Sequence, residues 1–204
     1  KEDVISNPDL GSIYEVPPVL AAQNFDTKVL AKLNLPEGKS DLSEWESFVK
    51  KLSSERKHKV TIAIIAKYLS TGNFELKDSY VSLLESLEFA AVHNDAELEV
   101  KFIKAEELEK KGSAAQDDLK AADGIIVPIG WGERGVEGKI SAIKYAREHK
   151  VPYLGLCYGM QLASIEFARH VVGLEGAHTK EVDPNTPHPI VHDIPFSEQY
   201  QTIK

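Results

Sequence analysis

Four short apolar runs, separated by segments with helical periodicity, constrain the fold of this chain more than any other feature. The first run, Val60–Ala66, is continuous and rich in β-branched residues, as is typical of a strand buried on both faces of a parallel sheet. Strands and helices alternate at the spacing of βαβ units, so we predict an α/β fold with a doubly wound, mostly parallel sheet and flanking helices. The other predicted strands are Leu98–Ile103, Gly124–Pro128 and Tyr153–Leu156, and the predicted helices are Lys77–Val92, a pair of short helices broken at Gly112, Val136–His149 and Gln161–Val172.

Glycine-rich turns follow the last two predicted strands, at residues 130–135 and 155–159. The carboxyl ends of parallel strands meet at one edge of the sheet, where such folds bind ligands, so we expect the two turns to be neighbours. The second turn reads Gly155-Leu156-Cys157-Tyr158-Gly159, with the only cysteine of the chain at its tip. Small flanking residues between a strand and a helix form a nucleophile elbow, which exposes the central side chain. Because a helix N-terminus favours negative charge on the sulfur, we interpret Cys157 as a nucleophile rather than as a core residue.

A cysteine that attacks a carbonyl group needs N–H donors for the oxyanion and a base for the proton. In an elbow, one donor is the N–H of the next residue, Tyr158, and Gly130 is the best candidate for the second. The sequence leaves His178, His188 and His192 open as bases, although a surface or turn histidine is the more frequent case. No spacing typical of zinc ligands occurs, so we predict no metal site.

The charge and the apolar content of the chain argue against two classes of partner, nucleic acids and membranes. A net charge of −8 argues against a nucleic-acid partner, because phosphate neutralisation needs clustered Lys and Arg side chains. No stretch approaches the roughly 18 apolar residues of a membrane span, and no signal peptide precedes the first strand, so we expect no membrane association. The single cysteine favours a reducing, cytoplasmic setting.

The segment before the first strand is expected to form a separate piece. Ile13–Pro18 is predicted to be an extended segment stopped by two prolines, and a helical pattern runs from Val19 to Leu33. After a turn-rich linker, Ser43 or Asp41 is predicted to cap a short helix that ends near Leu52, with Glu46 completing a capping box with Ser43.

Several motifs resemble the class I (triad) glutamine amidotransferases, and together they narrow the resemblance to the CTP synthase family. The nucleophile motif is Gly-Leu-Cys-Tyr-Gly-Met-Gln-Leu-Ala at 155–163, and the other similar stretches are 12–17, 41–45, 132–140, 165–169 and 181–189. The resemblance covers nearly the whole chain. It implies the tail of a synthase (amidoligase) domain at 1–35, an interdomain linker with a short helix at 36–58, and a glutaminase domain of flavodoxin-like fold at 59–204.

The resemblance also implies roles for single residues. Cys157 would form a glutamyl thioester from L-glutamine, and the ammonia would pass to a synthase domain that converts UTP and ATP to CTP. Arg134 would contact an allosteric nucleotide, GTP. The oxyanion donors would be the N–H groups of Gly130 and Tyr158, and the glutamine site would be lined by Gly130, Tyr158, Gly159, Met160, Gln161 and Glu181, the last suited by charge to hold the substrate α-ammonium. The whole enzyme would use Mg-ATP and form a homo-oligomer, a tetramer, whereas no cofactor is expected in this part.

The sequence departs from the family pattern at several places. Ile129 stands where the family has a glycine, and a β-branched residue resists positive φ. Tyr158 stands where the family has leucine, and residues 70–74 lengthen the loop after the first strand. The family's late His-Pro-Glu motif and its P-loop do not occur in the sequence, so we expect the chain alone to be inactive. The alternative is a catalytically incomplete binding or assembly module with the amidotransferase fold, and a cysteine hydrolase of another flavodoxin-like family would not explain residues 181–189.

Overall fold

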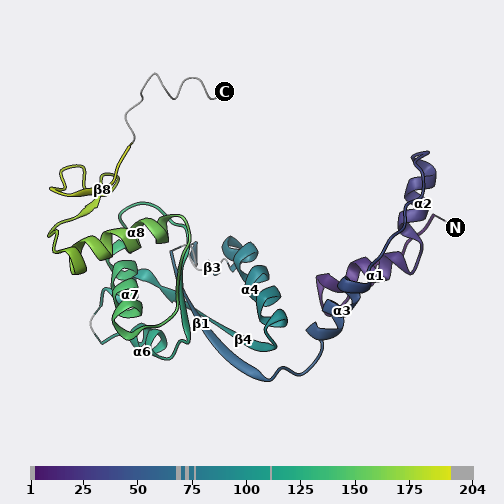
Figure 1. Ribbon diagram of the computed structural model, residues 1–204, viewed down its shortest axis with the longest axis horizontal. Coiled ribbons are helices and arrows are strands. Elements are labelled where there is room, and N and C mark those ends of the chain that lie inside the picture. Colours follow the sequence, from purple (N-terminus) through teal and green to yellow (C-terminus); the bar gives the residue numbers. More distant parts are fainter. Residues whose placement is uncertain (1–2, 68–69, 72–73, 76, 111, 194–204) are drawn as a thin grey trace, which may run out of the picture. The chain divides into compact units, whose positions relative to one another are not determined.

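The computed structural model describes residues 3–67, 70–71, 74–75, 77–110 and 112–193 (Figure 1). The chain forms two compact units. One unit holds the chain up to Lys57 together with Phe89–Ala96, and the other holds the remaining described residues. The predicted start of the glutaminase domain at residue 59 lies next to this boundary, but the identity of the first unit as part of a synthase domain remains a prediction.

The larger unit is built on a four-stranded sheet with the order β4-β1-β5-β6. Strand β1 pairs in parallel with β5, and β5 pairs in parallel with β6, so that Val127 lies opposite Gly155. The predicted strands are thereby confirmed, with small differences at their ends. Their bounds are β1 His58–Ala66, β4 Ala96–Lys104, β5 Gly124–Val127 and β6 Tyr153–Gly155.

Helices cover both faces of this sheet, because successive side chains of a strand point to opposite faces. On one face, Ile64 of β1 and Ile126 of β5 pack against leucines of α4. On the other face, Ile65 and Ile125 pack in a cluster with α5, α7 and α8, and Figure 1 shows α7 and α8 on the side away from α4. The doubly wound α/β prediction is confirmed. The helices are η2 Lys77–Tyr80, α4 Val81–His93, α5 Ala105–Leu108, α6 Ala114–Lys120, α7 Val136–His149 and α8 Tyr158–Phe167.

Helix α8 differs at both ends from the predicted range of Gln161–Val172. It begins at Tyr158 because Cys157 serves as its N-cap residue. It ends at Phe167 and continues into η3 (Ala168–Val172), a π-helix whose C-cap residue, Gly173, has φ of 81°. The wider turn changes the direction in which the following side chains point, and periodicity alone does not reveal it.

Two small strand pairs were not predicted from the sequence. After η3, β7 (His178–Thr179) and β8 (Pro189–Val191) form a parallel pair. Within the predicted loop extension at 70–74, β2 (Ser70–Thr71) and β3 (Phe74–Glu75) form an antiparallel pair, and residues 72–73 lie outside the described ranges. Strands of two or three residues are too short to show an alternating pattern.

The smaller unit is helical, which corrects one prediction. The segment expected to be extended forms η1 (Ile13–Glu15) and the start of α1 (Val16–Ala21). Its prolines occupy the first turn of α1, where a missing N–H breaks no intrahelical bond. The predicted helical pattern after them is split between the rest of α1 and α2 (Phe25–Lys32) by Asn24, which adopts φ of 53°.

Helix α3 (Ser43–Leu52) packs its aromatic side chains within the same unit. Phe48 contacts the rings of Tyr14 and Phe89, at centroid distances of 5.2 and 4.6 Å. The predicted Ser43 cap and capping box are wrong, because Ser43 is already the first helical residue. The N-cap residue is Leu42, which makes no side-chain cap, and Asp41 lies one position before it, where its Oδ1 accepts the N–H of Ser43 at 2.9 Å. Within the described ranges, no helix has both the length and the apolar character needed to cross a membrane.

Candidate active site

The turn between β6 and α8 places Cys157 in a conformation that is rare for a residue with a side chain. Cys157 has φ of 54° and ψ of −103°, and its thiol is exposed. A backbone of this kind at a non-glycine residue costs about 1–3 kcal/mol and persists only where the surroundings enforce it. The strand, tight turn and helix of a nucleophile elbow are therefore all present.

Close packing of two glycines enforces this turn. A Cβ atom on Gly159 would lie 2.0 Å from the carbonyl oxygen of Val127, and one on Gly155 would lie 2.7 Å from the backbone of Gly159. The N–H of Leu156 donates to the same Val127 carbonyl at 3.0 Å. The first turn of α8 thus sits directly on the end of β5, at a distance that only glycine permits.

The loop of residues 129–135, which we call the oxyanion loop, leaves the end of β5 beside this turn. The two turns are neighbours as predicted, because β5 and β6 are paired up to Val127 and Gly155. The positive φ values in the loop fall on Gly130, Gly132 and Gly135, at 140°, 86° and 77°, and not on Ile129. Ile129 therefore needs no conformation that a β-branched residue resists.

Two N–H groups at this edge of the sheet are available to a ligand. In the part of the chain that the structure describes, neither the N–H of Gly130 nor that of Tyr158 has a protein acceptor. Tyr158 is the first residue of α8, so its N–H has no intrahelical partner, and the helix end adds positive potential. The pair has the chemical character required of oxyanion donors.

Three charged side chains hold the oxyanion loop by its backbone. The Lys139 ammonium, from α7, donates to the carbonyl of Gly130 at 3.1 Å. Lys67, which follows β1, donates to the carbonyls of Trp131 and Gly132. On the other side, Glu181 accepts the N–H of Gly132 at 3.0 Å. Charged side chains therefore hold the middle of the loop, whereas its end at Gly135 packs closely, since a Cβ there would lie 2.9 Å from that of Ala105.

Burial shifts the pKa of several groups around the loop. Burial, together with the positive charge of Lys67, lowers the pKa of Lys139 to about 8. Burial and the Arg134 charge also lower the pKa of Lys67. Burial and the negative charge of Glu181 raise the pKa of Tyr158 to about 12. Tyr158 thus stays neutral at physiological pH, whereas Lys139 can lose its proton in a mildly basic solution.

The predicted glutamine-binding residues are only partly brought together. A pocket of about 450 Å³, within the range of small-molecule sites, is lined by Gln161 and Glu181. Gly159 is buried and Met160 is exposed, and neither lines this pocket. The other lining residues are Trp131, Thr179, Lys180, Val191, His192 and Asp193.

Arg134, predicted to contact a nucleotide, lies at the far side of the oxyanion loop. Its guanidinium donates to the carbonyl of Lys67 at 3.2 Å and pairs with Glu106 at 2.9 Å. It lines a separate pocket of about 560 Å³ whose other lining side chains are mostly carboxylates, from Glu106, Glu109, Glu133 and Glu137. Arg134 is the only cation among the residues that the structure places around this pocket.

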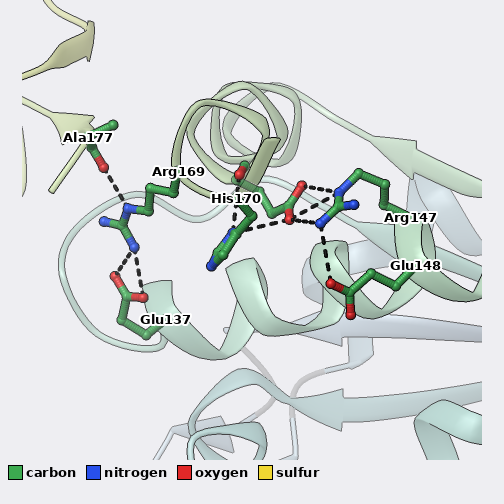
Figure 2. A network of polar contacts seen from close by, with 7 residues as sticks. Glu137, Arg147, Glu148, Arg169, His170 and Ala177 are labelled. Carbon is green, nitrogen blue, oxygen red and sulfur yellow. Dashed lines mark hydrogen bonds and ion pairs between the residues drawn. The ribbon is translucent and has the colours of Figure 1, made fainter. Parts of the chain in front are cut away.

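An arginine clamp positions the segment that carries Glu181 (Figure 2). Arg169 of η3 makes two 2.9 Å contacts with the carboxylate of Glu137 on α7. It also donates to the carbonyl of Ala177 at 2.6 Å, immediately before β7. A second network in the same view joins Arg147 to the buried carboxylate of Glu166, at 2.8 Å, and His170 to the same carboxylate.

The histidines near this segment make their hydrogen bonds to other groups than Cys157. Nδ1 of His178 accepts the N–H of Thr179 at 2.8 Å, which puts the proton of the neutral ring on Nε2, 3.7 Å from Glu137. Burial and the charge of Arg169 lower the pKa of His178, so the ring is neutral and structural. His192 lines the 450 Å³ pocket, and no histidine in the described ranges hydrogen-bonds to the Cys157 sulfur.

The contribution of Lys67 and Lys139, the two lysines that donate to the oxyanion loop, was not predicted from the sequence. A signal was available for Lys139, which shares the apolar face of its helix with Val136, Ile140 and Ile143. Lys67 directly follows the first buried strand, at the edge where the site was expected. In the described part of the chain, no group of three or more His, Cys, Asp or Glu side chains is placed to hold a metal ion.

Comparisons with known proteins agree with this geometry. The family model described as glutamine amidotransferase class-I matches residues 75–202. The CTP synthase of Caldanaerobacter subterraneus subsp. tengcongensis is 48% identical over 194 residues, which are 95% of this chain and 35% of that protein. The CTP synthase of Sulfurisphaera tokodaii is 50% identical over 93% of this chain and 34% of that protein. The chain thus spans about a third of the length of these curated relatives.

A solved structure is similar as well. The glutaminase domain of Trypanosoma brucei CTPS with bound acivicin is 35% identical, with a TM-score of 0.61 over 69% of this chain and 53% of that chain.

Proposed function

The chain belongs to the class I glutamine amidotransferases, and on this premise we propose that Cys157 hydrolyses the side-chain amide of L-glutamine and that the ammonia serves CTP synthesis. The observation that carries the proposal is the exposed thiol of Cys157, held at φ of 54° at the N-terminus of α8. A strained, exposed cysteine on a strand–turn–helix is the arrangement of a nucleophile.

In the proposed reaction, the Cys157 thiolate attacks the amide carbon of glutamine, and the carbonyl oxygen becomes an oxyanion. The N–H groups of Gly130 and Tyr158 donate to this oxygen, where charge develops. The C–N bond then breaks, the nitrogen takes up a proton and leaves as ammonia, and a glutamyl thioester remains. Water hydrolyses the thioester to glutamate and restores the thiol. The proton transfers need a base, which the His-Pro-Glu motif of the family would supply.

The pocket beside the oxyanion loop supports binding of an amino acid. Glu181 lines it and is held by the N–H of Gly132, so its carboxylate is positioned to accept the α-ammonium of glutamine. Gln161 supplies an amide from the first turns of α8. The similar glutaminase domain from Trypanosoma brucei was solved with bound acivicin, and we expect acivicin to bind at Cys157 here.

The wider activity is proposed from the curated relatives, which are CTP synthases. Ammonia would pass to a synthase domain that converts UTP and Mg-ATP to CTP in a cytoplasmic homotetramer. GTP would bind near Arg134 as an activator. The carboxylates around Arg134 in its pocket mean that further cations, from Mg²⁺ or another part of the protein, would have to balance a triphosphate.

The experiment uses the full-length protein and two nitrogen sources. We expect acivicin or a glutamine-like chloroketone to modify Cys157, located by peptide mass spectrometry, and to abolish glutamine-dependent CTP synthesis. The Cys157→Ala variant should lose glutamine-dependent synthesis and keep ammonia-dependent synthesis, because the synthase step does not use the thiol. Glutamine-dependent synthesis by Cys157→Ala at the wild-type rate would remove Cys157 from the mechanism.

The alternative is a binding or assembly module that keeps the amidotransferase fold without turnover. The observation in its favour is that no histidine in the described ranges hydrogen-bonds to the Cys157 sulfur. Release of glutamate from glutamine by the full-length protein, absent in Cys157→Ala, decides against this alternative.

A further inference from the structure

Lys139 is a buried lysine whose ammonium reaches the predicted oxyanion donors. Its side chain is only 1% exposed. The Nζ atom donates to the Gly130 carbonyl at 3.1 Å and lies 5.6 Å from the centre of the Tyr158 ring. Both neighbours are the residues to which the proposed reaction assigns the oxyanion N–H groups.

Burial of this ammonium is not compensated by an ion pair. Within the described residues, no carboxylate lies at ion-pair distance from Nζ. Lys67 repels Lys139, and only Glu106 attracts it, from beyond ion-pair distance. An apolar side chain would fill the same space without the desolvation cost of a charge. The contacts that distinguish a lysine here from a methionine are the hydrogen bond to Gly130 and the cation–π contact with the Tyr158 ring.

This bond fixes a peptide plane in the oxyanion loop. The peptide between Gly130 and Trp131 is trans, so the N–H in this plane, which belongs to Trp131, points away from Lys139 when the carbonyl points toward it. The N–H of Gly130 belongs to the preceding peptide, which is joined to the anchored plane through φ and ψ of Gly130. Gly130 has φ of 140°, a region open to glycine and therefore also easy to leave. Without an anchor on the carbonyl, the N–H of Gly130 and the N–H of Trp131 could both turn.

We propose that Lys139 is a positioning residue that anchors the Gly130 carbonyl, restricts rotation about φ and ψ of Gly130 and thereby keeps the oxyanion N–H of this residue in place. The proposal rests on the glutaminase activity proposed above. Lys139 touches no reacting atom and acts through the loop.

The same contact makes the loop sensitive to pH. A charged ammonium forms a stronger hydrogen bond than a neutral amine, and the pKa of Lys139 is lowered to about 8. The charged or titratable groups that face it are Lys67 beyond β1, Glu106 on α5 and Tyr158 on α8. The Tyr158 hydroxyl stays neutral until about pH 12. The anchor therefore weakens as pH rises through about 8.

The test compares Lys139→Met, Lys139→Arg and the control Lys144→Met, on the same helix, in the full-length protein. Lys139→Met should lower kcat for glutamine hydrolysis by about 10- to 100-fold, less than or similar to the loss of an oxyanion donor, with KM changed by less than about 3-fold. Amide hydrogen exchange in a peptide covering residues 128–135 should become several-fold faster. Lys139→Arg should recover part of both effects, and Lys144→Met should match the wild type.

The pH profile provides a second readout. Wild-type kcat should fall above about pH 8, whereas Lys139→Arg should not show this fall because a guanidinium keeps its proton. If the Lys139→Met variant has the same kcat and the same rate of loop exchange as the wild type, the proposal is overturned. If Lys139→Met does not fold, the test is the amide exchange rate of residues 128–135 in the wild type, corrected for the intrinsic pH dependence of exchange. A corrected rate that does not rise across pH 8 overturns the proposal. If the wild type does not hydrolyse glutamine, the proposed function is overturned instead. The exchange measurement then still tests whether Lys139 anchors the loop.

Discussion

The two turns that border Cys157 are held in place by different forces. In the elbow of residues 155–159, the first turn of α8 rests on the end of β5, with no room for a Cβ atom at Gly155 or Gly159. In the oxyanion loop, the backbone is held by Lys139, Lys67 and Glu181. Steric contact fixes the nucleophile, and charge fixes the proposed oxyanion donor.

Because of this difference, the geometry of the elbow should not depend on pH or salt, whereas the geometry of the oxyanion loop should. Excluded volume does not depend on pH or salt, so the geometry of the elbow persists wherever the protein is folded. Hydrogen bonds from ammonium groups depend on protonation, and partly buried ones are screened less by salt than surface pairs. We therefore expect changes of pH to reach the reaction through the loop before they reach the elbow.

Substitution of Gly159 by alanine should have the largest effect. The new Cβ would lie 2.0 Å from the Val127 carbonyl oxygen and 2.9 Å from its carbon, both backbone atoms that cannot move aside alone. We expect a loss of about 3 kcal/mol or more in the free energy of unfolding, measured with denaturant. Gly38→Ala, where a Cβ meets nothing within 4 Å, is the control. A loss below about 1 kcal/mol for Gly159→Ala would show that the elbow is not sterically fixed.

The Lys139→Met substitution should stabilise the protein at neutral pH while it lowers activity. A pKa lowered from 10.5 to about 8 corresponds to a cost of about 3 kcal/mol for keeping the charge buried. Loss of the hydrogen bond to Gly130 destabilises the variant by about 1 kcal/mol, so we expect its free energy of unfolding to exceed that of the wild type by about 2 kcal/mol at pH 7.

The gain should shrink with rising pH. Between about pH 8 and 10.5 the unfolded wild-type chain binds more protons than the folded one, so wild-type stability rises with pH from this group. The methionine variant lacks that rise. Denaturant unfolding at pH 7 and pH 10 measures both, and a gain that does not decrease would mean that the pKa of Lys139 is not lowered in the folded protein.

The comparison also explains how much the sequence could reveal. Steric features left clear patterns: the continuous apolar run Val60–Ala66 predicted β1, and the spaced glycines around Cys157 predicted the elbow. Helix α7 was predicted with the bounds that the structure gives it, Val136–His149. Each of these depends on neighbours within a few positions along the chain.

The electrostatic features depend on contacts that no local pattern encodes. Lys139 is recognisable as a lysine on an apolar helix face, but its acceptor is a backbone carbonyl nine positions earlier, and any carbonyl is available to any sequence. Glu181 reaches Gly132 across 49 positions. The helical position of the α1 prolines was missed because a local signal was ambiguous: proline breaks a helix interior but also suits a first turn.

The Glu181→Gln substitution should affect substrate binding more than stability. A glutamine side chain keeps an oxygen that can accept the N–H of Gly132, so the loop contact at 3.0 Å is retained. The negative charge for the substrate ammonium is lost, and we expect KM for glutamine to rise about 10-fold, equivalent to about 1.4 kcal/mol. Steady-state glutaminase kinetics measure this, with kcat for comparison. An unchanged KM would remove Glu181 from the glutamine site.

The smallest expected effect comes from Tyr158→Phe, which tests a buried side-chain hydroxyl of the elbow that lacks a hydrogen-bond partner. The Tyr158 hydroxyl is buried, and it has no hydrogen-bond partner in the described part of the protein. Removing an unsatisfied buried hydroxyl while keeping the ring should stabilise the fold by about 0.5–1 kcal/mol. The gain should be larger at pH 10 than at pH 7 by about 0.4 kcal/mol, because the hydroxyl ionises near its ordinary pKa of 10.0 in the unfolded chain, whereas the pKa in the folded protein is raised to about 12. Thermal unfolding at the two pH values measures this difference, and equal gains at both would mean that burial in the elbow does not raise the pKa of Tyr158.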